Sequence, residues 1–329
     1  MLPGFWSDRA CLVTGGAGFG GSHLCEQLLD RKARVYVLDQ HVARNSYLRL
    51  SGNIDRVADI LQGDVRDLDL AVSILHRHDI DTVFHAAAQP IVPLSRTTPL
   101  YTLSVNVMGT AVLLEASRQA GAVKNFVFAS SGGYYGTTWS RIPMGEEVTP
   151  LASRNIYATS KTAADVIVRS YFTTYGVNTV CCRFMNTYGP GDTHFSRIIP
   201  TAIKHLILGN SFEFDDRFGG STELDYLHVR DMSLAYIAAA ENLATVKGQA
   251  VNFGSGESVS SREIAVLISR LFDGKTREPM FPMPTGTDSP AKSLDITKAR
   301  DLLQWTPKIS LEDGLRETIE WYRRNWHHI

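Results

Sequence analysis

Gly15-Gly16-Ala17-Gly18-Phe19-Gly20-Gly21 is the stretch that decides the fold of this chain. It follows an apolar run, Ala10–Thr14, that predicts a buried strand, and it opens a helix-like segment near Gly18–Asp30. Glycines permit a tight turn and let backbone N–H groups approach a phosphate, while the helix N-terminus adds partial positive charge. A glycine-rich turn between a strand and a helix therefore predicts a dinucleotide pyrophosphate site.

Short apolar runs and longer amphipathic segments continue to alternate up to about residue 185. Predicted strands are Ala10–Thr14, Arg34–Leu38, Asp59–Gln62, Thr82–His85, Asn125–Ser130 and Asn178–Phe184. Predicted helices lie near Gly18–Asp30, Leu68–His78, Tyr101–Ala120 and Ser153–Tyr175. This order predicts an α/β fold with a doubly wound parallel sheet, whose strands end at one edge, where a ligand binds.

After residue 186 the regular alternation of predicted strands and helices ends. Helices are predicted at Arg197–Leu208, Val229–Leu243, Ser261–Phe272, Thr297–Leu303 and Leu311–Arg323, and the proline-rich stretch Asp273–Pro290 is predicted to be a loop. We expect residues 1–184 to form the dinucleotide-binding domain, completed by about 224–254. Residues 185–223 and 255–329 would then form a smaller α/β lobe that binds substrate.

Composition is that of an ordinary soluble globular protein, with 329 residues, 44% apolar and 20% charged. A formal net charge of −1 gives no bias toward nucleic acid or an anionic membrane. The four cysteines have no C-x-x-C spacing, and Cys181 and Cys182 lie in an apolar run, which predicts buried free thiols and a reducing compartment. With no signal-like N-terminus and no apolar run of about 18 residues, we expect a cytoplasmic protein. No metal site is predicted.

Asp39 ends the second predicted strand, 39 − 15 = 24 positions after Gly15. An acidic group at this place accepts hydrogen bonds from the adenosine ribose hydroxyls. Its charge would repel a 2′-phosphate, so NAD is favoured over NADP, although Arg44 lies close enough to weaken that preference.

The third and fourth strands end in further candidates. Asp64 and Val65 are predicted either to border the adenine or to form an ordinary solvated turn. Small side chains at Ala86 and Ala87 suit the close approach of a cofactor. His85, just before them, is more often a satisfied core histidine than a functional one.

Tyr157 and Lys161 are spaced i, i+4 in a helix-like segment and share one face. A nearby ammonium and an oxidised nicotinamide would favour phenolate, lowering the tyrosine pKa from its usual value near 10. Strand alternation lets only one of Ser130 and Ser131 face the cleft, and Ser131 is predicted to polarise the substrate; both hydroxyls could instead cap the following turn.

These residues resemble the extended short-chain dehydrogenase/reductase family, in its nucleotide-sugar epimerase/dehydratase branch. The matching motifs run over nearly the whole chain: Thr14-Gly15-x-x-Gly18-x-x-Gly21, Asp39, Asp64, His85-Ala86-Ala87, Asn106, Ser130-Ser131, Tyr157-x-x-x-Lys161, Arg183-Phe184-x-Asn186-x-Tyr188-Gly189-Pro190-Gly191 and Asp225-Tyr226-Leu227-His228-Val229-x-Asp231.

The resemblance implies a tightly held NAD that oxidises a sugar carbon and often returns the hydride. It implies Tyr157 as the base, Lys161 as the ribose ligand and Ser131 as the hydroxyl partner. Cofactor contacts are predicted at Gly15, Gly18, Phe19, Gly21, Asp39, Asp64, Val65, Ala86, Ala87, Asn106, Tyr157 and Lys161. It also implies a homodimer through the helices near Tyr101–Ala120 and Ser153–Tyr175.

The chain departs from the family at two places. The 4,6-dehydratases follow the hydroxyl residue with side chains that eliminate water, whereas this chain has Gly132 and Gly133. The arginines that usually bind the nucleotide diphosphate are replaced by Leu224 and Thr285, with Arg197, Arg217 and Lys292 as candidate substitutes. Substrate contacts are predicted at Gln89, Ser131, Asn186, Arg197 and Arg217.

The preferred hypothesis is an NAD-dependent nucleotide-sugar epimerase acting at C4 through a transient 4-keto sugar. A 4-ketoreductase and a 4,6-dehydratase with an atypical acid remain as alternatives. A non-catalytic dinucleotide-binding protein is a fourth interpretation, which the presence of Ser131, Tyr157 and Lys161 disfavours.

Overall fold

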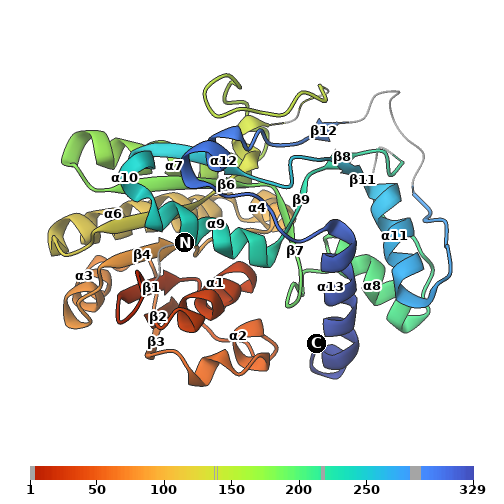
Figure 1. Cartoon of the computed structure of the whole chain (residues 1–329), viewed down its shortest axis with the longest axis horizontal. Coiled ribbons are helices and arrows are strands. Elements are labelled where there is room, and N and C mark those ends of the chain that lie inside the picture. The colour runs from red at the N-terminus through yellow and green to blue at the C-terminus, as the bar shows by residue number, and fades with distance from the viewer. Residues whose placement is uncertain (1–3, 137, 139, 216–218, 282–289) are drawn as a thin grey trace.

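Seven parallel strands form the centre of the protein (Figure 1). The computed structural model describes residues 4–136, 138, 140–215, 219–281 and 290–329. The strand order is β10-β6-β5-β4-β1-β2-β3, which confirms the predicted doubly wound sheet. The strands are β1 (Ala10–Thr14), β2 (Arg34–Asp39), β3 (Asp59–Gln62), β4 (Thr82–His85), β5 (Asn125–Ser131), β6 (Thr179–Phe184) and β10 (Gln249–Phe253).

The strand order reverses between β1 and β4, which pair in register from Cys11 with Thr82 to Thr14 with His85. At such a point the loops after the two strands diverge and leave room for a ligand at the carboxyl edge of the sheet. The glycine turn follows β1, and Ala86 follows β4. The fold therefore brings two of the predicted cofactor segments to one place.

Helices cover both faces of the sheet. On one face α1 (Phe19–Asp30) and α9 (Val229–Glu241) contribute to an apolar core, and on the other α3 (Leu68–Arg77), α6 (Gly109–Ala120) and α7 (Ile156–Tyr175) form a second one. The Asn155 side chain accepts a hydrogen bond from the Ala158 N–H at 2.8 Å, which fixes the start of α7. Shorter helical segments are α2 (Tyr47–Leu50), α4 (Val92–Thr97), α5 (Pro99–Leu103), a π-helical turn (Ser104–Met108), α10 (Leu243–Val246), α12 (Thr297–Leu303) and 3₁₀ turns at Asn53–Asp55, Gly132–Tyr135 and Trp326–His328.

The continuous helical stretch Pro99–Ala120 is long and apolar enough to cross a membrane by length and composition, which the sequence analysis did not anticipate. Half of it is buried inside the protein. Leu113 and Leu114 of α6 pack in the core beneath the sheet. The stretch Pro99–Ala120 is therefore one of the helices that pack against the central sheet.

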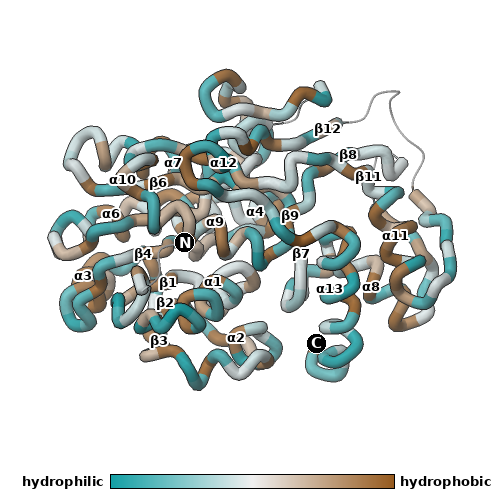
Figure 2. Tube along the Cα trace, viewed as in Figure 1, coloured by the Kyte–Doolittle hydropathy of each residue, from teal (hydrophilic) through white to brown (hydrophobic). Residues whose placement is uncertain are grey.

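A second group of helices lies beside the sheet, at the right of Figure 1. α8 (Ile198–Leu208), α11 (Ser261–Asp273) and α13 (Leu311–Asn325) share an apolar core that includes Ile203, Ile268 and Leu315. Apolar and polar stretches alternate along α11, as Figure 2 shows. Two small sheets join this group to the rest: β11 (Val259–Ser260), β8 (Glu223–Leu224) and β12 (Ala291–Lys292), and the pair β7 (Asn186–Tyr188) with β9 (Tyr226–His228). We retain the division into a dinucleotide domain and a substrate lobe as a proposal.

All four cysteines are free and buried, as predicted for Cys181 and Cys182. Burial raises the pKa of each thiol. Their role in the fold is that of small apolar side chains.

Candidate active site

The glycine turn lies against the loop that follows β4. Gly15 adopts φ +69°, and a Cβ at this position would lie 2.7 Å from the Cα of Ala87. A Cβ at Gly21 would overlap the Gly15 carbonyl oxygen, and Gly18 starts α1 with no described side chain capping its N–H groups. The Ala86 N–H donates to the Thr14 carbonyl at 3.2 Å and holds the second loop in place. The result is a tight cradle of backbone donors at a helix N-terminus, which suits a pyrophosphate.

Asp39 is built into the same cradle. Its Oδ2 accepts a hydrogen bond from the Ala17 N–H at 3.1 Å, and Oδ1 receives a long 3.5 Å contact from the His41 N–H, while the Gln40 N–H also interacts with this carboxyl. Partial burial raises the carboxyl pKa, and these backbone donors oppose the rise. Oδ1 therefore keeps acceptor capacity for a ribose hydroxyl.

In the loop after β3, the Asp64 carboxylate is bound by neighbouring side chains. Asp64 accepts from the Arg66 guanidinium at 2.9 Å and from Gln40 at 2.8 Å, and the Arg66 bond lowers its pKa. Val65 is buried against Gly109. Phe19 is half-buried at the start of α1 and meets His23 edge to face at 6.0 Å. Asp64 and Val65 follow β3, and Phe19 is the first residue of α1.

His85 is a core histidine. Its two ring nitrogens bond the hydroxyls of Thr14 at 2.8 Å and Thr110 at 2.9 Å. Burial lowers its pKa to about 3, so the ring is neutral at physiological pH. These hydrogen bonds support a structural role for His85.

Asn106 and Gln89 bind each other's segments. The Asn106 amide accepts from the Gln89 N–H at 2.7 Å and donates to the Gln89 carbonyl at 3.1 Å and the Ser160 hydroxyl at 2.9 Å. The Gln89 side chain donates to Thr102 at 2.8 Å and accepts from the Ile91 N–H. Both are buried, and these contacts position the loop after β4 against α7.

The two serines at the end of β5 face opposite ways. Ser130 donates to Asp165 at 2.6 Å, beneath the sheet, and Asp165 also takes both arms of the buried Arg183 at 2.9 and 3.0 Å. Ser131 instead accepts from the Gly133 N–H at 3.0 Å and hydrogen-bonds Tyr157. The alternation of the strand therefore places Ser131 beside the tyrosine.

Tyr157 and Lys161 lie on the same face of α7. Burial raises the Tyr157 pKa, and the hydrogen bond from Ser131 and the charge of Arg197 oppose it. Arg197 is the cation that lowers the Tyr157 pKa in this structure. The Lys161 ammonium donates to the Ala129 carbonyl at 2.7 Å. Burial lowers the Lys161 pKa to about 8, and two of its N–H donors remain for a ligand.

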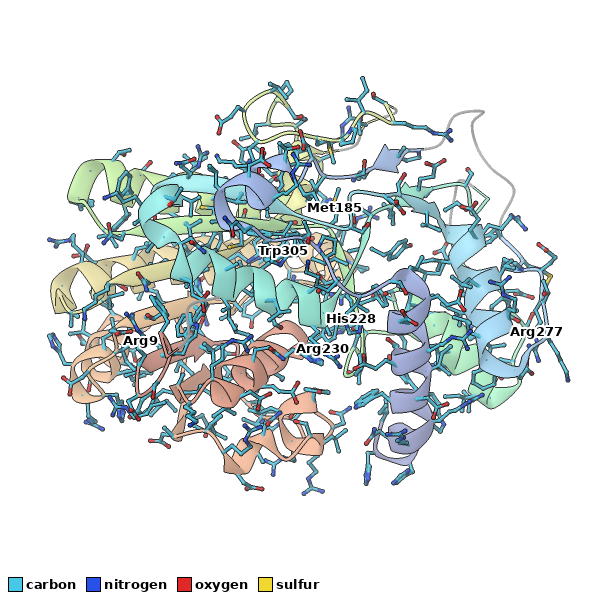
Figure 3. All side chains as sticks on the ribbon, in the orientation of Figure 1. Arg9, Met185, His228, Arg230, Arg277 and Trp305 are labelled. Carbon is cyan, nitrogen blue, oxygen red and sulfur yellow. The ribbon has the colours of Figure 1, made fainter. Side chains whose placement is uncertain are left out.

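Side chains at Gly132 and Gly133 would crowd their neighbours. A Cβ on Gly132 would lie 2.5 Å from the Sδ of Met185, which follows β6 and is labelled in Figure 3. A Cβ on Gly133 would lie 3.1 Å from the Ala158 Cβ and 3.2 Å from the Ser131 Oγ. No local pattern predicts that Met185 occupies this space, because the two segments are more than 50 residues apart.

The structure places only some of the residues that were predicted to contact substrate. Asn186 is exposed in β7, with its amide 3.5 Å from the Asp225 carbonyl. Arg197 caps α8, pairs with the buried Asp192 at 2.9 Å, and acts on Tyr157 as described above. Arg217 lies outside the described residues, as does Thr285.

The comparisons with known proteins agree with this geometry. The family model for GDP-mannose 4,6-dehydratase matches residues 12–318. A UDP-glucose 4-epimerase from Mycolicibacterium smegmatis is 34% identical over 316 residues, covering 95% of this chain and 98% of that protein. The solved UDP-glucose 4-epimerase of Thermotoga maritima, with UDP-glucose, superposes with TM-score 0.86 at 29% identity, covering 97% and 100%. The dTDP-glucose 4,6-dehydratase of Streptomyces venezuelae, solved with NAD, has TM-score 0.86 at 27% identity, covering 97% and 98%. The chain therefore belongs to the epimerase/dehydratase branch of the extended short-chain dehydrogenase/reductase family.

Proposed function

We propose that this protein is an NAD-dependent nucleotide-sugar 4-epimerase. The observation that carries the choice is that Gly132 and Gly133, directly after the hydroxyl residue Ser131, supply no acid or base, and that a Cβ at either position would be crowded by its neighbours. An enzyme that only oxidises and re-reduces a sugar carbon needs no acid or base there. An enzyme that eliminates water does need an acid or base at this position.

The residues fit NAD. The backbone cradle from Gly15 to Gly21 would hold the pyrophosphate, Asp39 the adenosine ribose, and the free donors of Lys161 the nicotinamide ribose. When bound, NAD accepts a hydride from the sugar carbon and returns it. A carboxylate at Asp39 disfavours a 2′-phosphate, which supports NAD over NADP.

Tyr157 is the group that moves the proton. Its phenol oxygen, bonded by Ser131 and facing the charge of Arg197, takes the proton of the C4 hydroxyl as the carbon is oxidised. It returns the proton once the hydride comes back on the other face of the keto sugar. Before substrate binds, the Ser131 hydroxyl donates to the phenol oxygen and keeps it oriented. With substrate bound, its one proton turns to the same substrate oxygen.

Three buried aspartates that could be considered as acids already have partners within the protein. Asp165 is engaged by Ser130 and Arg183. Asp192 pairs with Arg197, and Asp225 accepts from Ser255 at 2.7 Å. These buried carboxylates stabilise the fold and are not available as proton donors.

The test is turnover of UDP-glucose by the purified protein, followed by proton NMR. The proposal expects UDP-galactose with no net change in reduced cofactor, and loss of turnover in Tyr157→Phe with NAD still bound. If UDP-glucose is inert, the same assay is repeated with dTDP-, GDP- and CDP-glucose. A 4-keto-6-deoxy product would replace this proposal by the dehydratase, and stoichiometric oxidation of NADH with a keto sugar would replace it by the reductase.

We also propose a cytoplasmic homodimer. Exposed apolar side chains gather on α5, the π-helical turn and α7: Leu100 is 79% exposed, Met108 56% and Val166 43%. A second copy of this helical face is the partner that the family suggests. Light scattering of the purified protein should give twice the chain mass, and Leu100→Glu should reduce it to a monomer.

A further inference from the structure

Asp165 continues the line of Tyr157 and Lys161 along one face of α7. The three residues are spaced four apart, so each side chain stands about one helical turn from the next. Each of the three contacts the last residues of β5: Tyr157 with the Ser131 hydroxyl, Lys161 with the Ala129 carbonyl at 2.7 Å, and Asp165 with the Ser130 hydroxyl at 2.6 Å. This face of α7 therefore binds the end of β5 at three successive points.

Asp165 also joins β5 to β6. Ser130 and Arg183 are paired in register on these two strands, and the Arg183 guanidinium donates to both oxygens of Asp165, at 2.9 and 3.0 Å. Arg169 of α7 adds a further donor at 3.0 Å. The Asp165 carboxylate is fully buried, so any displacement would leave a buried polar group unpaired, which is costly. The helix and the two strands are thereby fixed relative to one another.

Arg183 also binds the turn that follows Ser131. Its guanidinium donates to the Tyr135 hydroxyl at 2.9 Å and lies 3.7 Å from the centre of the Tyr134 ring. Both tyrosines belong to the 3₁₀ turn Gly132–Tyr135, which starts directly after Ser131. Ser131 is therefore held on both sides, by the residue before it and by the turn after it.

The position of the Ser131 hydroxyl matters because a group that orients a phenol must stay within hydrogen-bond reach of it. A misplacement of about 1 Å at a reacting centre can lower the rate about 100-fold. We propose that Asp165 is a positioning residue for the reaction, which acts through Ser130 and Arg183 to keep Ser131 against Tyr157. The inference rests on the proposed function in taking Tyr157 as the group that moves the proton. It adds that a buried residue about two helical turns away sets how well that group is oriented.

Titration of Tyr157 in the NAD-bound protein tests this role without using turnover. Protein labelled with carbon-13 at the tyrosine Cζ is followed by NMR as the pH is raised, and Tyr157→Phe assigns the Tyr157 signal among the 12 tyrosines. The variants are Ser130→Ala, Ser131→Ala and the double variant. Asp165 itself is left in place, so that its ion pairs still stabilise the fold. Ser117→Ala, which removes a buried hydroxyl from α6, is the matched control.

Ser131→Ala removes a donor to the phenolate and should move the midpoint of the Tyr157 titration upward by about one pH unit. Ser130→Ala should move it upward by at least about half as much, because Ser131 is no longer held in place. The double variant should match Ser131→Ala, since Ser130 acts only through Ser131. Ser117→Ala should leave the midpoint unchanged. With substrate, Ser130→Ala should lower kcat about tenfold and leave KM unchanged.

A midpoint in Ser130→Ala equal to that of wild type would overturn the positioning role of Asp165. So would a double variant in which the two shifts add, or a Ser131→Ala variant that titrates like wild type. A protein that shows the expected shifts but epimerises no nucleotide sugar would refute only the proposed function. An active epimerase in which Ser130→Ala changes neither the midpoint nor kcat would refute only the positioning role.

Discussion

Gly133→Ala separates packing from catalysis at the position where this chain departs from the dehydratases. The added methyl would lie 3.1 Å from the Ala158 Cβ and 3.2 Å from the Ser131 Oγ, while the backbone there is not in the left-handed region. Overpacking of this kind costs about 1–3 kcal/mol. Replacing glycine lowers the entropy of the unfolded chain and returns about 0.4–1 kcal/mol. We therefore expect a net loss of about 0.5–2 kcal/mol in the free energy of unfolding.

The effect on turnover should be larger than the effect on stability. Ala158 is held in α7, so Ser131 is the group that moves, and its hydrogen bond to Tyr157 is weakened. A hydrogen bond to a charged group contributes about 1.5–3 kcal/mol, which corresponds to a decrease in kcat of about 10- to 100-fold.

Urea unfolding and the initial rate of epimerisation measure the two effects on the same preparation. Gly145→Ala is the matched control, because a Cβ there meets the exposed side chain of Val148 at 3.1 Å and the Asp295 carboxylate at an ordinary contact distance of 3.8 Å. Full kcat in Gly133→Ala, with stability lowered as expected, would show that Ser131 does not orient Tyr157 and would refute the reasoning.

Three further predictions follow from single contacts. Asp165→Asn leaves the buried Arg183 without its carboxylate and should lower the free energy of unfolding by about 3–5 kcal/mol in urea, whereas Asp301→Asn, at an exposed pair, should change it little. Asp39→Ser should shift the ratio of NADP to NAD affinity about tenfold toward NADP, measured by fluorescence titration; an unchanged ratio would remove Asp39 from the ribose site. Lys161 has a pKa of about 8 when folded and about 10.4 when unfolded, so the unfolded chain binds more protons between these values. The stability of NAD-free wild type relative to Lys161→Met should rise by about 3 kcal/mol from pH 8 to pH 10.4, and a flat difference across this range would contradict the burial of the ammonium.

The architecture of the sheet could be predicted because its signals are local. Buried parallel strands read as short apolar runs, and the six strands of the first half were placed within one residue of their observed ends. The cap residues Asn155 and Ser310 were not used to place the helix starts, and the predicted start at Ser153 lies three residues before the observed start of α7 at Ile156. The two-residue strands β8, β11 and β12 were not predicted, since a pair of residues carries no periodicity.

The site was predictable where one strand or one helix decides it. Alternation along β5 separated Ser131 from Ser130, and i, i+4 spacing put Tyr157 and Lys161 on one face. Contacts between distant segments had no local signal. Met185 over Gly132, Arg197 acting on Tyr157, and the amide of Asn106 bound to the Gln89 backbone all depend on how the loops fold back.

The central claim is that hydride leaves and returns to the same sugar carbon without loss of water. It is tested most directly by incubating the purified protein with UDP-glucose carrying deuterium at C4 and analysing the product by mass spectrometry and NMR. The account predicts UDP-galactose that retains the deuterium at C4. A product lighter by one water, or deuterium moved from C4 to C6, would contradict it.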